Sequence, residues 1–233
     1  MLAGWLDRQP APAAWVVLCT ALAALVAVAW PRSWRVLRHV VTIVHEGGHA
    51  TLALVTGRRL RGIRLHSDTS GVTVSSGRPT GPGMVLTALA GYVFPALVGL
   101  AAAAAVSSGR LTATLWAATG LLALLLLQVR NVFGVLSVVL TGAVLVLVSR
   151  FADASWQGAA AYLLTWFLLV GAPVPVVELQ RARSAGGAPT SDADQLARLT
   201  RLPGLVWVGV FLLVTLGAAV AGAGLLLREV LRA

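Results

Sequence analysis

The sequence predicts an all-α fold: a polytopic bundle of transmembrane helices with one small β-hairpin at the membrane surface. Hydrophobic residues make up 58% of the 233 residues and charged residues only 11%, whereas about 25% of the residues in soluble domains are charged. The mean hydropathy of +0.86 is correspondingly high. Long apolar runs recur with short polar breaks. This pattern favours membrane helices over the alternating segments of about ten residues that are typical of a transmembrane β-barrel.

Seven apolar runs predict seven membrane helices, or six if the region 111–149 is misread. Each run is close to the 17–25 residues that a helix needs to cross a bilayer. The runs cover about Ala13–Trp30, Val36–Val55, Met84–Val106, Leu111–Gln128, Val132–Ser149, Gly158–Val177 and Gly204–Leu227.

Two polar stretches are expected outside the bilayer. In Arg58–Ser76, Ile63 and Leu65 alternate with charged neighbours before a turn at 68–71, a pattern that predicts a β-hairpin. The second stretch, residues 178–203, is predicted to be a loop with a short helix from about Ser191 to Arg201. We treat residues 1–233 as a single integral membrane domain.

The chain is strongly basic, with a formal net charge of +10, and all 18 basic residues are arginines. They lie where apolar runs end, as topology determinants do. No aromatic and basic recognition module accompanies them, so the expected partner is the lipid bilayer and not nucleic acid. With seven spans, the side that holds the hairpin and the 178–203 loop carries more arginines. The positive-inside rule then places both in the cytoplasm of a multi-pass protein of the cell membrane, most simply a bacterial plasma membrane.

The sequence His45-Glu46-Gly47-Gly48-His49 lies within the second apolar run. Residues four apart face the same side of a helix, so both imidazoles can bind one Zn²⁺ ion. Glu46 is next to them, in position to take a proton from a water molecule at the metal. The alternative is a pair of hydrogen-bonded core histidines. Such polar groups are costly within a membrane unless they bind something or line a water-filled cavity, which favours the metal site.

A zinc site of this kind needs a third protein ligand and leaves its fourth position for water. Asp192 and Asp194 begin the predicted short helix, on the same side of the membrane as the C-terminal half of the motif helix. We favour Asp192 as the third ligand. The alternative is ordinary helix capping, with Ser191 as the N-cap and both aspartates in the first turn. One aspartate could also bind the metal while the other caps the helix.

Other polar residues are weaker candidates. His39 is expected at a helix interface, and His66 with Asp68 is expected in a surface turn. Asn131 lies in a short break between two runs, where an interhelical turn explains it better than contact with the zinc. Tyr92 belongs to a stretch that could form an irregular helix near the active site.

With this motif inside an early membrane helix, the sequence resembles the site-2 protease family of membrane-embedded zinc metalloproteases. It is most similar to the compact bacterial group without an inserted PDZ domain. The similarity is closest over Val40–Gly57, and the family's hairpin and third helix resemble Arg58–Ser76 and Ala90–Pro95. A weaker similarity covers Ser191–Trp207.

The resemblance implies that His45 and His49 bind zinc and that Glu46 is the general base. The implied substrate is a transmembrane or membrane-proximal peptide, bound in extended form by pairing with an edge strand of the hairpin. Typical members supply the third ligand from an Asp-Gly motif in a later membrane helix, and this chain contains no Asp-Gly dipeptide. The resemblance therefore leaves the third ligand open.

The predicted function is that of a zinc-dependent intramembrane or membrane-proximal metalloprotease acting on membrane proteins. One alternative is a non-catalytic homologue that regulates a membrane partner. The missing Asp-Gly motif favours it, and the intact Glu46 opposes it. A zinc or proton transporter is a second alternative, but transporters usually carry internal repeats and several polar clusters. Small-residue spacing such as Gly217 with Ala221 allows helix pairing without defining the oligomeric state.

Overall fold

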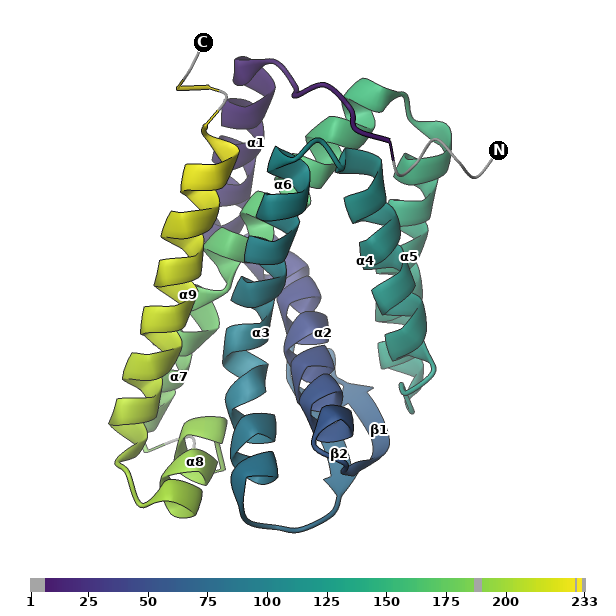
Figure 1. Cartoon of the computed structure of the whole chain (residues 1–233). Helices are drawn as coiled ribbons and strands as arrows, with labels where there is room; N and C mark the ends of the chain where they lie inside the picture. Colours follow the sequence, from purple (N-terminus) through teal and green to yellow (C-terminus); the bar gives the residue numbers. More distant parts are fainter. Residues whose placement is uncertain (1–6, 187–189, 229, 232–233) are drawn as a thin grey trace.

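The computed structural model describes residues 7–186, 190–228 and 230–231 (Figure 1). These residues form helices around a central α3, with a two-stranded sheet and the short α8 at one end of the bundle. In chain order the elements are α1 (Ala14–Ala29), α2 (Pro31–Val55), β1 (Arg59–Leu65), β2 (Gly71–Ser76), α3 (Pro82–Ser107), α4 (Leu111–Leu126), α5 (Val132–Phe151), α6 (Ala154–Gly171), α7 (Pro173–Ser184), α8 (Asp192–Thr200) and α9 (Gly204–Leu226).

Every predicted apolar run is helical, so the predicted helical membrane bundle with a small hairpin is confirmed. The number of full-length spans is lower than the predicted seven. Among the described residues, four stretches are long and apolar enough to cross a membrane, or five if α1 and α2 count as one broken span, and α4 is a shorter apolar helix. The four are Pro82–Ser107, Val132–Phe151, Ala154–Ser184 and Gly204–Leu226.

The first two helices meet at a bend of 102°. Pro31 causes the break, because a proline fits the first position of a new helix and disfavours helical backbone in the residue before it. Trp30 accordingly has extended backbone angles, and its amide donates to the carbonyl of Val26 to close α1. As a result α2 turns away from the direction of α1 and runs to the end of the bundle that holds the sheet and α8 (Figure 1).

Residues 7–13, which lead into α1, lie at the opposite end of the bundle from the hairpin (Figure 1). The backbone amide of Gln9 donates to the carbonyl of Gly109. The Gln9 side chain accepts hydrogen bonds from the amide and hydroxyl of Thr112, at the α3–α4 connection. The seven-span count placed this segment on the hairpin side. That placement is wrong, because α1 and α2 meet at a bend of 102° and residue 9 lies beside the α3–α4 connection, away from the hairpin.

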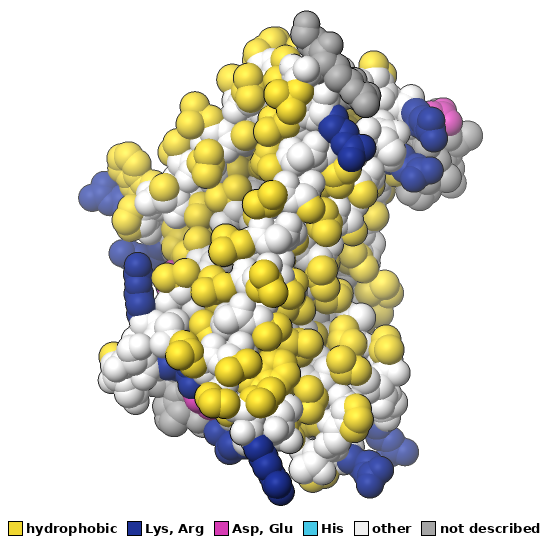
Figure 2. Space-filling view, turned by 60° about the vertical axis from the view of Figure 1, so that its left-hand side comes forward, with side chains coloured by type: hydrophobic (Ala, Val, Ile, Leu, Met, Phe, Trp, Pro, Cys, Tyr) yellow, Lys and Arg dark blue, Asp and Glu magenta, His cyan; other side chains and the backbone are white. Residues whose placement is uncertain are grey.

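The outer surface is strongly apolar. Figure 2 shows one face on which hydrophobic side chains cover the middle, with arginines towards its margins. Leu213 and Val220 of α9, each 75% exposed, are examples of side chains that water would solvate poorly. Such a surface suits contact with lipid.

The hairpin forms as predicted, with β1 and β2 antiparallel and Ile63 and Leu65 fully buried. The α4–α5 connection forms hydrogen bonds with the β1 edge of the hairpin. Ile63 donates to the carbonyl of Gln128 and accepts from the amide of Arg130. The side-chain amide of Asn131 both accepts from Leu65 N and donates to Leu65 O, at 3.1 and 2.7 Å. The sheet is therefore fixed to the bundle through backbone groups.

The predicted loop at 178–203 begins later than expected, because α7 continues to Ser184. Glu178 is therefore part of a long apolar stretch, where its carboxylate forms an ion pair of 2.7 Å with Arg38 of α2. It also accepts a hydrogen bond from Trp34 Nε1. The pairing explains how this carboxylate is accommodated among apolar helices.

The short helix α8 docks on the bundle through its apolar face. Ala193 and Leu196 are fully buried in a cluster that includes Val176 of α7 and Phe211 of α9. This packing fixes the rotation of α8 about its own axis. It also determines which of its first-turn side chains points towards α2.

Candidate metal centre

The motif of α2 brings two imidazoles and a carboxylate to one place. The Nε2 atoms of His45 and His49 lie 3.1 Å apart, as expected for residues one helical turn from each other. Glu46 between them is only 3% exposed. Two ring nitrogens at this distance, beside a buried carboxylate, form an unusually polar spot within a helix bundle.

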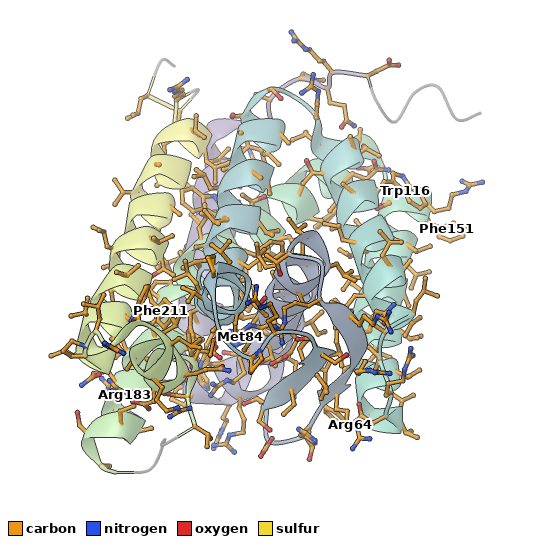
Figure 3. All side chains as sticks on the ribbon, turned by 60° about the horizontal axis from the view of Figure 1, so that its bottom comes forward. Arg64, Met84, Trp116, Phe151, Arg183 and Phe211 are labelled. Carbon is orange, nitrogen blue, oxygen red and sulfur yellow. The ribbon has the colours of Figure 1, made fainter. Side chains whose placement is uncertain are left out.

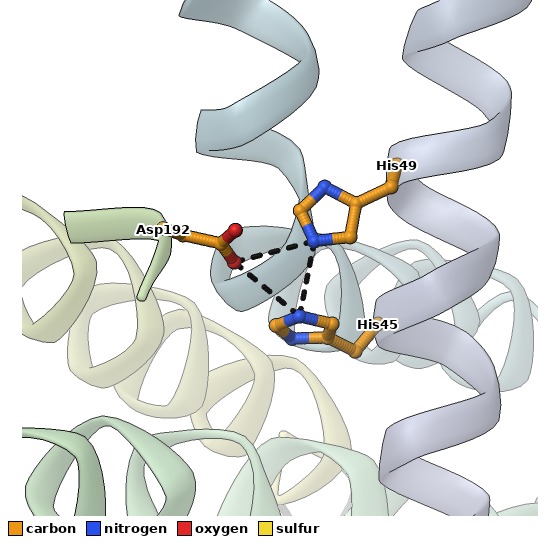
Figure 4. Close-up of side chains that lie close together, drawn as sticks. All are labelled: His45, His49 and Asp192. Carbon is orange, nitrogen blue, oxygen red and sulfur yellow. Dashed lines mark hydrogen bonds and ion pairs between the residues drawn. The ribbon is translucent and has the colours of Figure 1, made fainter. Parts of the chain in front are cut away.

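Asp192 completes this cluster from the other side (Figure 4). Its Oδ2 lies 3.4 Å from Nε2 of His45 and 3.2 Å from Nε2 of His49. The three ligand atoms lie within 4.8 Å of one another, and each side chain is partly buried. A single ion could therefore contact all three.

The neighbouring aspartate has a different role. Asp194 accepts hydrogen bonds from Arg183 Nη2, at 2.7 Å, and from the hydroxyl of Ser191, at 2.6 Å. Ser191 in turn caps α8 by accepting from the amide of Asp194. The two aspartates thus have different roles: Asp194 belongs to the helix cap, and Asp192 faces the histidines. This is the alternative in which one aspartate binds the metal while the other caps α8.

The orientation of His49 is fixed by the backbone of α3. Its Nδ1 lies 2.7 Å from the carbonyl oxygen of Thr87. A carbonyl can only accept, so Nδ1 carries the proton and donates it. In the neutral ring Nε2 is then left with a free lone pair facing Asp192, which is the arrangement found in metal-binding histidines.

The space beside the two imidazoles suits a metal ion. A Cβ atom at Gly91 of α3 would contact Nε2 of His49 and lie 2.6 Å from Nε2 of His45. The absence of a side chain at Gly91 leaves this place open. Ligand atoms 2.0–2.1 Å from a tetrahedral zinc ion are about 3.3 Å apart, close to the separations of 3.1–3.4 Å in this cluster. The residues present therefore fit Zn²⁺.

Electrostatics favour the ionised form of Asp192. Burial by itself would raise the pKa of this carboxyl, but the neighbouring His49 and His45 outweigh it and hold the pKa below its usual range. An ionised carboxylate is the form that coordinates a metal.

Glu46 lies against the hairpin. The hydroxyl of Thr73 in β2 is 2.6 Å from Glu46 Oε2. Gly71 lies two residues earlier on the same face of β2, and a Cβ atom there would lie 2.5 Å from Glu46 Oε1. The first half of β2 therefore packs directly on this carboxylate, and a residue larger than glycine at position 71 would displace it.

A cavity of about 500 Å³ opens over the cluster. Three parts of the chain surround it: the hairpin, the start of α3 and the start of α8. In Figure 3, seen more from the hairpin end, Met84 of α3 lies between Arg64 of β1 and Arg183 of α7. The cavity is lined by His45, Glu46, His49, Arg58, Gly71, Val72, Thr73, Val74, Ser75, Met84, Thr87, Ala88, Tyr92, Thr190, Ser191, Asp192 and Gln195.

The weaker candidates lie in varied positions. His39 packs its ring against Phe133 of α5, as expected for an interface residue. His66 contacts Ser70 in the surface turn of the hairpin. Asn131 binds the backbone of β1 and does not point to the cluster. Tyr92 does reach the cluster, and its ring meets that of His45 edge-on at 4.7 Å.

Three contributors to the site were missed by sequence reasoning: Thr73, Thr87 and Gly91. Thr87 acts through its backbone carbonyl, so its side chain carries no signal. Thr73 and Gly91 are ordinary residues for a strand and a membrane helix. One signal was available for α3, because Thr87 and Gly91 are four residues apart and face the same side.

The comparisons with curated proteins and with solved structures gave no match. The comparison with protein families did, over residues 18–222, with the family described as Peptidase M50B-like. The matched region includes the motif of α2, the hairpin, α3 and Asp192. It confirms the resemblance to the site-2 proteases that the sequence suggested. The chain therefore belongs to the Peptidase M50B-like family of membrane-embedded peptidases.

Proposed function

We propose that this chain is a zinc-dependent metalloprotease that hydrolyses peptide bonds of membrane proteins within or beside the bilayer. The observation that carries the proposal is the meeting of Asp192 with His45 and His49, at 3.2–3.4 Å, next to the buried Glu46. Three ligands leave one coordination position for water, which is the arrangement of catalytic zinc sites. Membership of a peptidase family supports the same reaction.

In this proposal His45, His49 and Asp192 hold the zinc ion, and Glu46 is the general base. The ion, when bound, supplies activation of water and polarisation of the scissile carbonyl. Glu46 accepts a proton from the attacking water and passes it to the nitrogen of the leaving amine. The Thr87 carbonyl keeps the His49 ring in the tautomer that can bind metal.

The hairpin offers a place for an extended substrate. The buried half of β1 is paired with the α4–α5 connection, whereas the described part of the chain gives the outer edge of β2 no backbone partner. Gly71–Ser75 line the cavity, and Val72 and Val74 are about half exposed. A peptide that added a strand to this edge would bring its carbonyl groups close to the metal centre.

We further propose that the hairpin end of the bundle faces the cytoplasm of a cell membrane. The hairpin, the α4–α5 connection and the α7–α9 region carry Arg58, Arg59, Arg61, Arg64, Arg78, Arg130, Arg181, Arg183, Arg198 and Arg201. Fewer arginines flank the helices at the opposite end: Arg8, Arg110, Arg150 and Arg228. The positive-inside rule supports this orientation.

The metal site is tested by elemental analysis of protein purified in detergent without chelators. We expect one zinc per chain in the wild type and much less in His45→Ala and in Asp192→Ala. Asp194→Ala is the matched control, because it removes a carboxylate from the same turn of α8 that faces away from the histidines. A wild type that stays metal-free after zinc addition would overturn the proposal.

Proteolysis is tested with single-span reporter proteins reconstituted with the enzyme in liposomes. We expect cleavage in or next to the apolar span, abolished by chelation and restored by zinc. Zinc-bound protein that leaves an entire panel of such reporters intact would favour the alternative of a non-catalytic relative.

A further inference from the structure

We propose, building on the function proposed above, that Thr73 of β2 is a positioning residue that holds the Glu46 carboxylate in the orientation needed for proton transfer. Glu46 belongs to the motif helix α2, and Thr73 belongs to the hairpin. Strand β2 therefore has a role in the chemistry in addition to any role in binding substrate.

The contact between the two residues is short and specific. Thr73 Oγ1 lies 2.6 Å from Glu46 Oε2 and 3.2 Å from the backbone oxygen of Glu46. A hydroxyl has one proton to donate. The shorter contact is in the range of 2.5–2.7 Å for a hydroxyl that donates to an ionised carboxylate, so the carboxylate receives the proton.

This hydrogen bond makes the two carboxylate oxygens inequivalent. Oε2 is bound to Thr73, whereas Oε1 lies on the side of Gly71, where there is no side chain. Gly71 and Glu46 both line the cavity. Oε1 is thus the oxygen left free to accept a proton from water in the cavity, and rotation about the Cγ–Cδ bond of Glu46 is restricted.

The strand that carries Thr73 is held in place independently. Thr73 lies opposite Ile63 in the pairing of β2 with β1. Strand β1 is in turn fixed by Asn131, which binds the backbone of Leu65, and by residues 128 and 130, which pair with the backbone of Ile63. Thr42 of α2 donates to the carbonyl of Thr69 in the turn, at 2.9 Å. Removing the Thr73 hydroxyl therefore leaves the position of β2 determined by other contacts, so the consequences should be confined to Glu46.

The hydrogen bond from Thr73 preorganises Glu46 for its role as general base. A general base contributes most when its accepting atom is within hydrogen-bond reach of the proton it abstracts, and small errors in position are costly. A carboxylate on a two-carbon side chain has several rotamers. The Thr73 hydroxyl selects one of them before substrate binds.

The test compares Thr73→Val and Thr73→Ser with Thr42→Val in the zinc-loaded, full-length protein. Valine keeps the shape of threonine and suits a strand, but it has no hydroxyl. Serine restores the hydroxyl. Thr42→Val is the matched control, because it removes a hydroxyl that also ties α2 to the hairpin but does not touch Glu46.

With a reporter that the wild type cleaves, we expect kcat to fall about 10- to 100-fold in Thr73→Val, with KM within about twofold, as for other residues that orient a reacting group. Thr73→Ser should recover most of kcat. Thr42→Val and the zinc content of all three variants should be close to wild type. Loss of zinc in Thr73→Val, or an unchanged kcat, would overturn the inference.

A second readout needs no proteolysis. The chain has only eight aspartates and glutamates. The difference between the infrared absorption spectra of wild type and Glu46→Gln therefore identifies the carboxylate stretching band of Glu46. We expect this band to shift in Thr73→Val, to return in Thr73→Ser and to stay unchanged in Thr42→Val.

The two readouts separate the two proposals. Zinc-loaded wild type that cleaves no reporter overturns the proposed function, and the infrared band then decides the Thr73–Glu46 bond by itself. An active wild type with an unshifted band in Thr73→Val overturns the positioning role alone.

Discussion

His49 donates from Nδ1 to the backbone carbonyl of Thr87, 2.7 Å away, which joins the motif helix α2 to α3. Gly91 follows Thr87 by one helical turn and lies against the Nε2 atoms of the same histidine pair. One face of α3 therefore both orients the His49 ring and leaves room for an ion beside it.

Gly91→Ala should lower zinc occupancy while leaving the helices folded. Alanine is a better helix former than glycine, so α3 itself should not be weakened. Its Cβ would meet both Nε2 atoms and compete with the ion for the same space. Zinc content and helical circular dichroism, measured on the same sample, distinguish the two effects.

Gly209→Ala in α9 is the matched control, since a Cβ at Gly209 has no atom within 4 Å among the described residues. It should keep the zinc content of the wild type. Equal zinc occupancy in Gly91→Ala and wild type would show that the ion lies elsewhere.

Glu46→Gln should keep the metal and lose activity. Glutamine has nearly the same shape and can still accept a hydrogen bond from Thr73, but it cannot take up a proton. A general base typically contributes 10²- to 10⁴-fold in rate, and we expect a loss in that range. Cleavage of the single-span reporter and zinc analysis check this together. Full activity in Glu46→Gln would remove Glu46 from the mechanism.

The Arg183–Asp194 pair should stabilise the protein in a pH-dependent way. Hydrogen bonds from Arg183 and Ser191 hold the pKa of Asp194 below its usual value. Since the folded pKa is lowered, the stabilisation is fully present above the unfolded pKa of about 3.9, and it is lost as the pH falls through the folded value.

Arg183→Gln should therefore reduce the free energy of unfolding by up to about 1 kcal/mol at pH 7. The difference from wild type should narrow below about pH 4. Thermal unfolding in detergent measures this difference in stability, and a chelator in the sample prevents interference from the metal site. A difference that is the same at pH 7 and pH 3 would contradict a role for the ionised Asp194.

Asn131→Ala should loosen the edge of the hairpin. The amide of Leu65 loses its acceptor and its carbonyl loses a donor, so hydrogen exchange at Leu65 should accelerate. Gln128→Ala is the control, because Gln128 contacts Ile63 through its backbone oxygen and not through its side chain. Equal protection of Leu65 in Asn131→Ala and wild type would show that the hairpin is held by other contacts.

The orientation in the membrane can be measured with single cysteines in a Cys19→Ala background. Ser67 in the hairpin turn and Ser155 at the start of α6 are both exposed and lie at opposite ends of the bundle. In intact cells we expect an impermeant thiol reagent to label Ser155→Cys, and to label Ser67→Cys only after the membrane is opened. The reverse pattern would invert the proposed topology.

Much of this site could be predicted because the signals are local. The four-residue spacing of His45 and His49 follows from helix periodicity, and the hairpin follows from alternation around a turn. The choice between the two aspartates was less clear, since both occupy the first turn of α8. Helix periodicity distinguishes the two. Asp192 is four residues from the buried Leu196 and so shares its inward face, whereas Asp194 is four residues from the charged Arg198.

The remaining features depend on contacts between distant segments. The contact of Thr73 with Glu46 spans 27 residues, and that of Thr87 with His49 spans 38. Their side chains are ordinary for a strand or helix, so no local pattern identifies the distant residue that each one contacts. The span count was too high for a similar reason. Pro31 predicts a break in the helix, but only the structure shows that α1 and α2 meet at 102°, so that the two together can count as one broken span.

The asymmetry of the small sheet also limits how copies of the chain can associate. β1 is closed where Ile63 and Leu65 meet the α4–α5 connection, while the edge of β2 is open to the cavity. Sheets that grow into fibres need two free edges on every molecule. Two copies joined through β2 would leave no further strand to extend, so self-association by strand pairing would end at a dimer, and that dimer would cover the metal centre of each partner.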